Sequence, residues 1–358
     1  MINRNPNFSA GPSKLPNKVV ERLKDEAFDY QGKGFAIFEI SHRSDLFKEL
    51  ITDTKKRFLD LCGVKDTHQA IFLHGGANLQ FLMIPQNFAL NQRIALVNTG
   101  HWSQKTIIQA EQFAKVEQIA SSQAENFSYI PKFDASRLDQ AYLHLTSNNT
   151  IYGSQYRKLP KSNIPLVVDA SSDILSQPFE GDKIDLAYGG AQKNFSLSGL
   201  GFALISNNFL AKAKADLPTM LSYKKIAESN SLFNTPNTFA IYAGNLTLQW
   251  IEAMGGLEKM EQRNIKKAKN LYEAIDNSKG FYQGLVRSED RSLMNVTFRL
   301  ADQALEQKFI SEAQSQQLYF LKGHKAIGGL RASTYNSAEL SEVAQLTDFM
   351  RNFITKNS

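Results

Sequence analysis

The sequence predicts an α/β protein in which a large domain, with a mostly parallel sheet covered by helices, precedes a smaller α+β C-terminal domain. Through most of the chain, short apolar runs typical of buried strands alternate with segments of helical spacing, which favours a parallel sheet covered on both faces. After Gly255-Gly256 the order changes to helix, strands and helix. A chain of 358 residues with 42% hydrophobic composition is long enough for one large and one smaller domain.

Six apolar runs are the expected strands of the large domain. They occupy residues 70–73, 94–97, 141–145, 165–168, 184–188 and 202–205. Two helices are predicted before the first of these strands, because apolar side chains share one face over residues 19–28 and another over residues 47–58.

The C-terminal part has its own pattern. An apolar helical stripe covers residues 260–275, and a second one, over residues 340–353, predicts a final helix. Between them lie strand-like segments at 294–298 and 318–321. We therefore expect the boundary between the two domains near residue 257.

The charge balance is basic but does not indicate a nucleic-acid partner. The chain has 41 basic and 35 acidic residues, a net charge of +6 and a pI near 9.1. The densest basic run, Lys266, Lys267 and Lys269, lies in a segment of amphipathic period, so we expect a solvated helix face there. A surplus of positive charge also suits small anionic substrates.

A single cysteine and the absence of long apolar runs exclude several classes of protein. Cys62 alone excludes an intramolecular disulfide and thiolate-rich metal sites, and it lies in an apolar stretch that predicts a core position. No metal site is predicted. No segment approaches the roughly 20 apolar residues of a membrane helix, and the N-terminus lacks the apolar run of a signal peptide. We expect a cytoplasmic protein without a membrane partner.

Two neighbouring predicted strands end in residues that can do chemistry. Residues 165–168 lead directly into Asp169, which could pair with a protonated ring nitrogen or could cap the following turn. Residues 184–188 run through Gly189-Gly190 to Lys193, 24 residues after Asp169. A lysine in such a crevice can lose solvation and attack a carbonyl, whereas an ordinary lysine would lie on a surface loop. The surrounding glycines indicate close backbone approach and favour the first interpretation.

A third feature predicts an anion site. Residues 70–73 pass through Gly75-Gly76 into a helix expected to begin near Ala77, and the free N–H groups of a helix start attract anions. The motif is neither a Walker loop nor a GxGxxG fingerprint, so a nucleotide is not indicated. A phosphate cradle, a carboxylate for a pyridinium and an amine for an aldehyde are together what pyridoxal 5′-phosphate requires of a protein.

Several motifs in the same order resemble the phosphoserine aminotransferases, a family of the class V group of fold-type I pyridoxal-phosphate enzymes. The resemblance covers essentially the whole chain. Its motifs are residues 7–12, 41–43, 75–76, 189–194, 233–236, 321–324 and 328–333. It implies the fold-type I transferase fold with a mostly parallel, seven-stranded-type sheet. It also implies an N-terminal arm over residues 1–15 that contributes to the small domain and active site, a cofactor-binding domain over 16–257 and a small domain over 258–358.

The resemblance also implies the cofactor contacts. Lys193 would be the catalytic residue, holding the cofactor as a Schiff base and shuttling a proton, and Asp169 would hold the pyridinium nitrogen. Trp102 would stack on the ring, although a lone tryptophan is more often a core residue. Thr150 would bond the phenolic oxygen. Around the phosphate would lie Ala77, Asn78 and Gln192, with Asn234 and Thr235 reaching it from the second subunit of a homodimer with shared active sites.

The implied substrates, L-glutamate and 3-phosphohydroxypyruvate, carry anions at both ends, which guanidinium groups bind well. The resemblance assigns Arg331 to the α-carboxylate and adds Ser9 to the substrate site. It assigns the distal anion to His42, Arg43 and His324. Lys325 stands where many members carry arginine, so the bidentate fork is lost there, and Ala77-Asn78 replaces a Gly-Arg pair of some members.

The expected products are O-phospho-L-serine and 2-oxoglutarate, in L-serine biosynthesis; whether the phosphorylated hydroxythreonine step of pyridoxine biosynthesis is also served stays open. The nearest alternative is another class V enzyme, such as a serine–pyruvate or alanine–glyoxylate aminotransferase, whose keto acids offer no distal anion to a cluster of cations. A cysteine desulfurase would need a mobile cysteine, for which Cys62 is poorly placed. A binding protein on a catalytically dead version of the fold is disfavoured by the presence of both Lys193 and Asp169.

Overall fold

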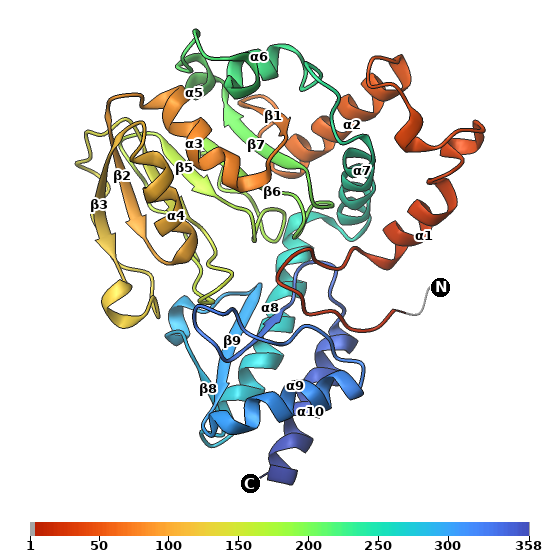
Figure 1. The fold of residues 1–358 in the computed structure, drawn as a ribbon, viewed down its shortest axis with the longest axis vertical. Helices are drawn as coiled ribbons and strands as arrows, with labels where there is room; N and C mark the ends of the chain where they lie inside the picture. Colours follow the sequence, from red (N-terminus) through yellow and green to blue (C-terminus); the bar gives the residue numbers. More distant parts are fainter. Residues whose placement is uncertain (1–3, 358) are drawn as a thin grey trace.

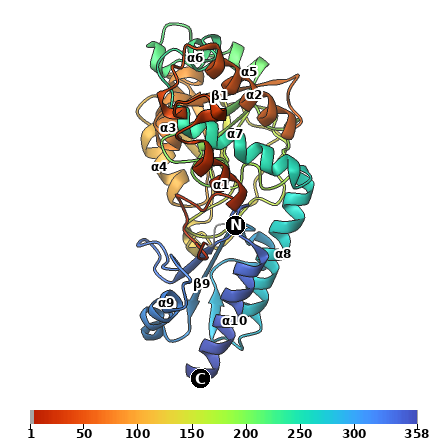
Figure 2. The same ribbon diagram turned by 90° about the vertical axis from the view of Figure 1, so that its right-hand side faces the viewer.

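The structure, a computed structural model, describes residues 4–357, so the first three residues of the expected N-terminal arm lie outside it. Figures 1 and 2 show a part built on a large sheet, a second part built on a small sheet, and the N-terminal segment passing between the two. Within the described range, no helix combines the length and the apolar character needed to cross a bilayer.

The large sheet has seven strands in the order β1-β7-β6-β5-β4-β2-β3. Its strands are β1 His68–Leu73, β2 Arg93–Asn98, β3 Lys115–Ser121, β4 Leu143–Thr146, β5 Leu166–Asp169, β6 Leu186–Gly190 and β7 Gly201–Ser206. Strands β3, β2, β4, β5 and β6 pair in parallel, whereas β7 is antiparallel to both β6 and β1. The expected mostly parallel sheet is therefore confirmed.

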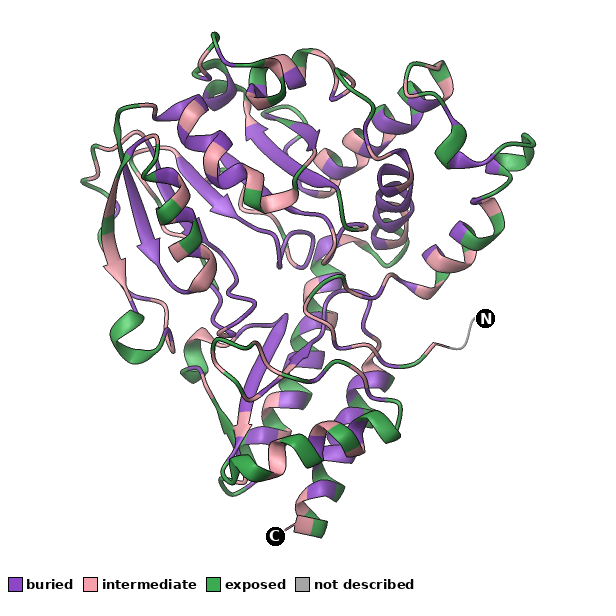
Figure 3. Cartoon of the chain, in the orientation of Figure 1, coloured by how far each residue is buried: buried purple, intermediate pink, exposed green. Residues whose placement is uncertain are grey.

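Helices cover both faces of this sheet, and short 3-10 turns connect them. The helices are α1 Asn17–Glu26, α2 Asp45–Leu61, α3 Gly76–Phe88, α4 His101–Ala110, α5 Asn207–Ala211, α6 Tyr223–Glu228 and α7 Thr238–Ala253. The 3-10 turns of the whole chain are η1 Tyr30–Gly32, η2 Ile37–Glu39, η3 Gln123–Glu125, η4 Thr219–Leu221, η5 Ser288–Asp290 and η6 Gln303–Leu305. Figure 3 shows the central strands of the sheet and α7 as the most continuously buried elements, whereas the edge strand β3 is only partly buried.

The continuous apolar runs of the central strands follow from this two-sided cover. In β5, Leu166 and Val168 belong to the core on the face of α2 and α7, while Val167 belongs to the core on the opposite face. Successive strand side chains point to opposite faces, so a strand covered on both sides needs apolar residues at every position.

The C-terminal part contains a three-stranded antiparallel sheet in the order β10-β9-β8, packed against helices. Its elements are α8 Gly256–Asp276, β8 Tyr282–Gly284, β9 Asn295–Leu300, α9 Glu306–Ser315, β10 Leu330–Ser333 and α10 Leu340–Asn357. The α+β character of this part is confirmed. The exact boundary near residue 257 and the extent of the arm remain predictions.

Some local predictions were wrong. Residues 318–321 do not form a regular strand, because Phe320 has a left-handed φ of 67° that breaks the extension. Tyr319 makes one isolated bridge, to Asn7, and the next bridge, from Lys322 to Leu330, lies just beyond this segment. Phe28, expected on the apolar face of the first helix, follows the end of α1 and is 77% exposed. The edge strand β3 was missed because its alternating polar residues are only partly buried.

Lys267 corrects the prediction of a solvated basic face on α8. Lys266 and Lys269 are exposed as expected, but Lys267 has a relative exposure of 0%. Its Nζ donates to the carbonyl oxygens of Thr334 at 2.9 Å and Tyr335 at 2.6 Å. Burial lowers the pKa of Lys267 well below its ordinary value. These carbonyls replace water around the ammonium and tie α8 to the segment that follows β10.

Candidate active site

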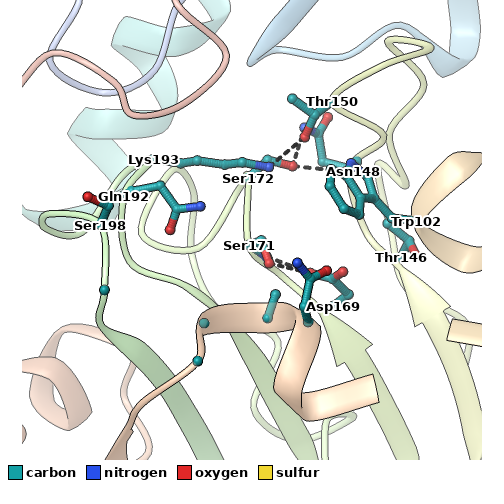
Figure 4. A pocket seen from close by; sticks show the side chains of 15 residues that line it. Trp102, Thr146, Asn148, Thr150, Asp169, Ser171, Ser172, Gln192, Lys193 and Ser198 are labelled. Carbon is teal, nitrogen blue, oxygen red and sulfur yellow. Dashed lines mark hydrogen bonds between the residues drawn. The ribbon is translucent and has the colours of Figure 1, made fainter. Parts of the chain in front are cut away.

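A cavity of about 330 Å³ opens at the carboxyl ends of the central strands, beside the start of α3. This is where an open α/β sheet generally binds its ligand. Figure 4 shows the side chains that line it. The lining residues are Gly75, Gly76, Ala77, Asn78, Trp102, Thr146, Asn148, Thr150, Asp169, Ser171, Ser172, Gln192, Lys193, Ser198 and Gly199. Seven of the residues predicted to bind a cofactor are among them: Ala77, Asn78, Trp102, Thr150, Asp169, Gln192 and Lys193.

Lys193 follows the Gly189-Gly190 end of β6 and extends its amine into the cavity (Figure 4). Its Nζ donates to Thr150 Oγ1 at 2.8 Å and lies 5.9 Å from the centre of the Trp102 ring. Desolvation lowers the pKa of Lys193 to about 8, against the opposing attraction of Asp169. The backbone of Lys193 is held by the Ser13 hydroxyl, which donates to its carbonyl. The amine is therefore fixed in place and partly neutral near physiological pH.

Asp169 ends β5 and is only 5% exposed. One carboxylate oxygen, Oδ1, accepts from the backbone N–H of Ser171 at 3.0 Å and from its hydroxyl at 2.6 Å. Within residues 4–357 the other oxygen, Oδ2, accepts no hydrogen bond. Burial raises the pKa of Asp169, while the Ser171 bonds and Lys193 favour its charged form. The residue thus caps the turn, one of the two open interpretations, and keeps a second oxygen for a ligand.

Glycine at position 189 allows this close arrangement. A Cβ at Gly189 would lie 2.7 Å from Ser171 Cα and 2.7 Å from the Phe202 ring. Any side chain there would push β6 away from the turn that Asp169 caps. The sequence signal of flanking glycines therefore corresponds to real close contact between backbones.

The start of α3 supplies the anion end of the cavity. Gly75 takes a left-handed φ of 76°, and a Cβ there would lie 2.7 Å from Leu79 Cβ. This turn directs the first helical N–H groups, near Ala77 and Asn78, toward the cavity that these residues line. The Gln192 amide lies on the same wall, over Gly190, where a Cβ would come within 2.4 Å of Gln192 Oε1.

The donor set fits pyridoxal phosphate on observations of this chain alone. Two buried polar atoms, Trp102 Nε1 and Thr146 Oγ1, belong to residues of the cavity wall and have no partner among the described residues. Together with the free Asp169 oxygen they are unsatisfied groups of the kind that a bound polar molecule completes. An aldehyde could meet the Lys193 amine, a ring nitrogen the Asp169 carboxylate, and a phosphate the α3 start.

The predicted substrate residues fall into two sets. Arg331, on β10, donates through Nη1 to the Thr150 carbonyl at 3.0 Å, and burial lowers its pKa, so its guanidinium lies beside the residue that contacts Lys193. Desolvation lowers the pKa of His324, and the nearby positive charge of Arg331 lowers it further. Ser9 accepts from the Gly11 N–H at 3.3 Å, and Gly11 lies against the Lys193 side chain. None of the three lines the cavity itself, but Arg331 contacts it through Thr150 and Ser9 through Gly11.

The second set does not meet the cavity within one chain. Asn234 contacts His74 Nε2 at 3.2 Å and, like Thr235, is exposed on a loop away from the cavity wall. His42 and Arg43 precede α2, and no contact joins either side chain to His324 or Lys193 among the described residues. Lys325 follows His324 and is exposed.

Sequence reasoning missed several polar residues of the wall. They are Thr146, Asn148, Ser171, Ser172 and Ser198. Thr146 ends β4, Asn148 follows it closely, and Ser171 and Ser172 follow β5. The rule that ligands bind at the carboxyl ends of strands, which pointed to Asp169, therefore also applies to the polar residues after the predicted strands 141–145 and 165–168. His101 and Lys105, at the start of α4, were also not singled out, because an isolated histidine or lysine on a helix gives no signal.

Comparison with known proteins gives a consistent result. The chain matches the aminotransferase class-V family over residues 6–346. A phosphoserine aminotransferase of Campylobacter lari is 45% identical over 356 residues, covering 98% of this chain and 99% of the relative. A solved phosphoserine aminotransferase from Bacillus circulans subsp. alkalophilus superposes with a TM-score of 0.96 at 42% identity, covering 99% of both chains.

A second solved structure, described as pyridoxal-phosphate-bound phosphoserine aminotransferase from Trichomonas vaginalis, has a TM-score of 0.91 at 33% identity and covers 97% of this chain and 100% of its own. Sequence identity of this size over whole chains agrees with the seven-stranded sheet and the lysine-bearing cavity in identifying the family. The chain belongs to the class-V aminotransferases and, within them, to the phosphoserine aminotransferase family.

Proposed function

We propose that this chain transfers the amino group of L-glutamate to 3-phosphohydroxypyruvate, giving O-phospho-L-serine and 2-oxoglutarate, in a reversible reaction of L-serine biosynthesis. One observation carries the proposal beyond family membership. The Lys193 amine, the free Asp169 oxygen and the α3 start share one cavity, and the Arg331 guanidinium contacts its wall at the Thr150 carbonyl. Class V membership and the pyridoxal-phosphate-bound relative support the cofactor.

Each wall of the cavity would hold one part of pyridoxal phosphate. Asp169 would pair with the ring nitrogen and Trp102 would face the ring, while Thr150 would lie beside the phenolic oxygen. The phosphate would be held by Ala77, Asn78 and Gln192. Once bound, the cofactor supplies an electron sink for the substrate α-carbon, and the charged Asp169 strengthens that sink by keeping the ring nitrogen protonated.

Lys193 provides the base. Its Nζ is 2.8 Å from the Thr150 hydroxyl, and desolvation favours its neutral form, which is the form that can accept a proton. We assign to this nitrogen the uptake of the proton from the substrate α-carbon and its later return.

The two ends of the substrate would meet different cations. Arg331 spends one N–H on the Thr150 carbonyl, so its remaining donors are available for the α-carboxylate, with Ser9 nearby. His324 and Lys325 would bind the distal phosphate or γ-carboxylate. The Lys325 ammonium keeps the charge of an arginine but lacks its planar fork, so geometry at that end depends on additional groups.

A homodimer with shared active sites is part of the proposal. Asn234 and Thr235 lie on an exposed loop. Two apolar side chains beside them are open to solvent in the single chain, since Phe233 is 52% exposed and Met220 is 40% exposed. A second copy would bury this surface and bring the loop to the partner's cofactor phosphate. The same dimer interface would bring His42 and Arg43 to the distal anion. The buried His42 Nε2 has no hydrogen-bond partner among residues 4–357. We also propose the division into an arm, a domain over 16–257 and one over 258–358, and a cytoplasmic location.

A glutamate-dependent assay with three keto acids tests the function. We expect turnover of 3-phosphohydroxypyruvate with a kcat/KM at least about 100-fold above those of pyruvate and glyoxylate, since a dianion paired with several cations contributes a few kcal/mol. Comparable values for glyoxylate would instead support the alternative class V activity. A purified holoprotein that bound the cofactor yet transferred no amino group would support a dead version of the fold.

A further inference from the structure

A histidine and a lysine in the N-terminal half of α4 point to a role outside the residues assigned above. His101 and Lys105 are four residues apart and therefore share a helix face. The His101 ring centre lies 5.6 Å from that of His324, so a residue of the large-sheet part meets one of the small-sheet part. It also lies 5.3 Å from the centre of the Trp102 ring.

Lys105 is linked to the active site through the same tryptophan. Its Nζ lies 5.1 Å from the centre of the Trp102 ring, and Lys193 Nζ lies 5.9 Å from that centre. Both ammonium groups are thus within about one side-chain length of a ring that forms part of the cavity wall. The α4 pair is therefore at the edge of the substrate pocket.

The surroundings of this pair contain cations without matching anions. Desolvation lowers the pKa of His101, and Lys105 and Lys325 lower it further. Desolvation likewise lowers the pKa of His324, and Arg331, His101, Lys325 and Lys105 add to that effect. No carboxylate contributes to either shift. Within residues 4–357, none of these five side chains forms a salt bridge.

Such a cluster is unfavourable until an anion neutralises it. Like charges close together disfavour one another, and a multiply charged ligand removes the repulsion and gains attraction from every member. A phosphate monoester, with up to two negative charges and three acceptor oxygens, gains more from the Lys105 ammonium and from an imidazole N–H of His101 than the single γ-carboxylate of glutamate does. The cluster also lies where Lys325 lacks the fork of an arginine and leaves geometry to be supplied by other donors.

We propose that His101 and Lys105 are specificity-determining residues that bind the phosphate end of the keto-acid substrate together with His324 and Lys325. This inference rests on the proposed function, because it extends the distal-anion pocket of that reaction. The cofactor phosphate is a separate group, held at the α3 start on another wall. The α4 pair selects phosphorylated over unphosphorylated substrates and takes no part in proton transfer.

The test uses the holoenzyme with His101→Gln, Lys105→Gln and the double variant. Lys266→Gln, which removes an exposed lysine on α8, is the control of equal charge. We expect each single change to raise KM for 3-phosphohydroxypyruvate about 5- to 30-fold, with kcat within twofold and KM for L-glutamate within threefold. Lys105→Arg should restore most of the affinity. Lys266→Gln should behave like the unmodified enzyme.

A second readout does not depend on turnover. We expect calorimetric titration of the holoenzyme with inorganic phosphate, in which the bound cofactor already fills its own phosphate site, to show binding that weakens in both single variants and in the double variant but not in Lys266→Gln. Equal increases of KM for both substrates, or unchanged phosphate binding in the double variant, would overturn the inference. If the unmodified enzyme fails to use 3-phosphohydroxypyruvate, the proposed function fails, and the phosphate titration still decides whether the α4 pair binds an anion.

Discussion

The lowered pKa of Lys193 can be tested by following how fast the apoenzyme captures pyridoxal phosphate as the pH changes. Only the neutral amine attacks the aldehyde, so the capture rate reports the neutral fraction of Lys193. A pKa of about 8, against 10.5 for an ordinary lysine, makes about 10% of the amine neutral at pH 7, compared with about 0.03% for an unperturbed lysine. The structure attributes this difference first to desolvation in the cavity.

The expected profile has a distinctive shape. Between pH 7 and pH 8 the rate should rise about fivefold, as the neutral fraction goes from about 10% to about half, and between pH 8 and pH 9 it should rise less than about twofold before reaching a plateau. Stopped-flow absorbance of the apoenzyme mixed with saturating pyridoxal phosphate measures this. A rate that climbs tenfold for each pH unit to beyond pH 10 would refute the desolvated environment of Lys193.

Two variants sharpen the experiment. Lys193→Ala should bind the cofactor without the covalent absorbance that borohydride bleaches, which identifies the signal as that of Lys193. Asp169→Asn removes the carboxylate that raises the Lys193 pKa, so the midpoint of the profile should move to lower pH. A midpoint that moved upward in Asp169→Asn would contradict the electrostatic arrangement of the cavity.

Three further outcomes are expected. Asp169→Asn should lower kcat by about 100- to 10,000-fold while cofactor stays bound, measured by steady-state turnover and absorbance, because the ring nitrogen loses its charged partner; a loss under tenfold would contradict the assigned role. Arg331→Lys should raise KM for both L-glutamate and the keto acid about 10- to 100-fold, because each substrate carries an α-carboxylate that Arg331 would bind. An effect on one substrate alone would argue against this role of Arg331. Lys267→Ala should lower the free energy of unfolding by about 3 kcal/mol in chemical denaturation, since it empties a buried site and removes a donor from two carbonyls, of which that of Tyr335 keeps the Ala338 N–H. The exposed Lys266→Ala should change it by less than about 0.5 kcal/mol.

Much of the architecture could be predicted from the sequence because strands buried on both faces must be apolar at every position. That constraint made β1, β2, β5 and β7 visible as runs. It does not apply to the edge strand β3, nor to the short β8 and β10, whose pairing is decided by contacts far along the chain. The segment 318–321 was also mispredicted, because the left-handed backbone of Phe320 interrupts an apolar run that has the composition of a strand.

The site was predictable where chemistry follows a strand end and unpredictable where it arises from packing between distant segments. Asp169 and Lys193 gave a local signal. The meeting of His101 with His324, 223 positions along the chain, gave none. The burial of Lys267 also depends on carbonyls that follow β10, so no helical period could have separated it from its exposed neighbours Lys266 and Lys269.

Thr150 contacts two functional side chains at once, which has a consequence for redesign. Its hydroxyl accepts from the Lys193 amine and its carbonyl accepts from Arg331, so one residue sets the spacing between the proposed proton carrier and the proposed α-carboxylate-binding group. A side-chain change such as Thr150→Val alters only the first contact and tunes the reactivity of the amine. An insertion or deletion in the loop that carries Thr150 would displace both contacts together. Variation of this enzyme is therefore easier by substitution than by changing the length of that loop.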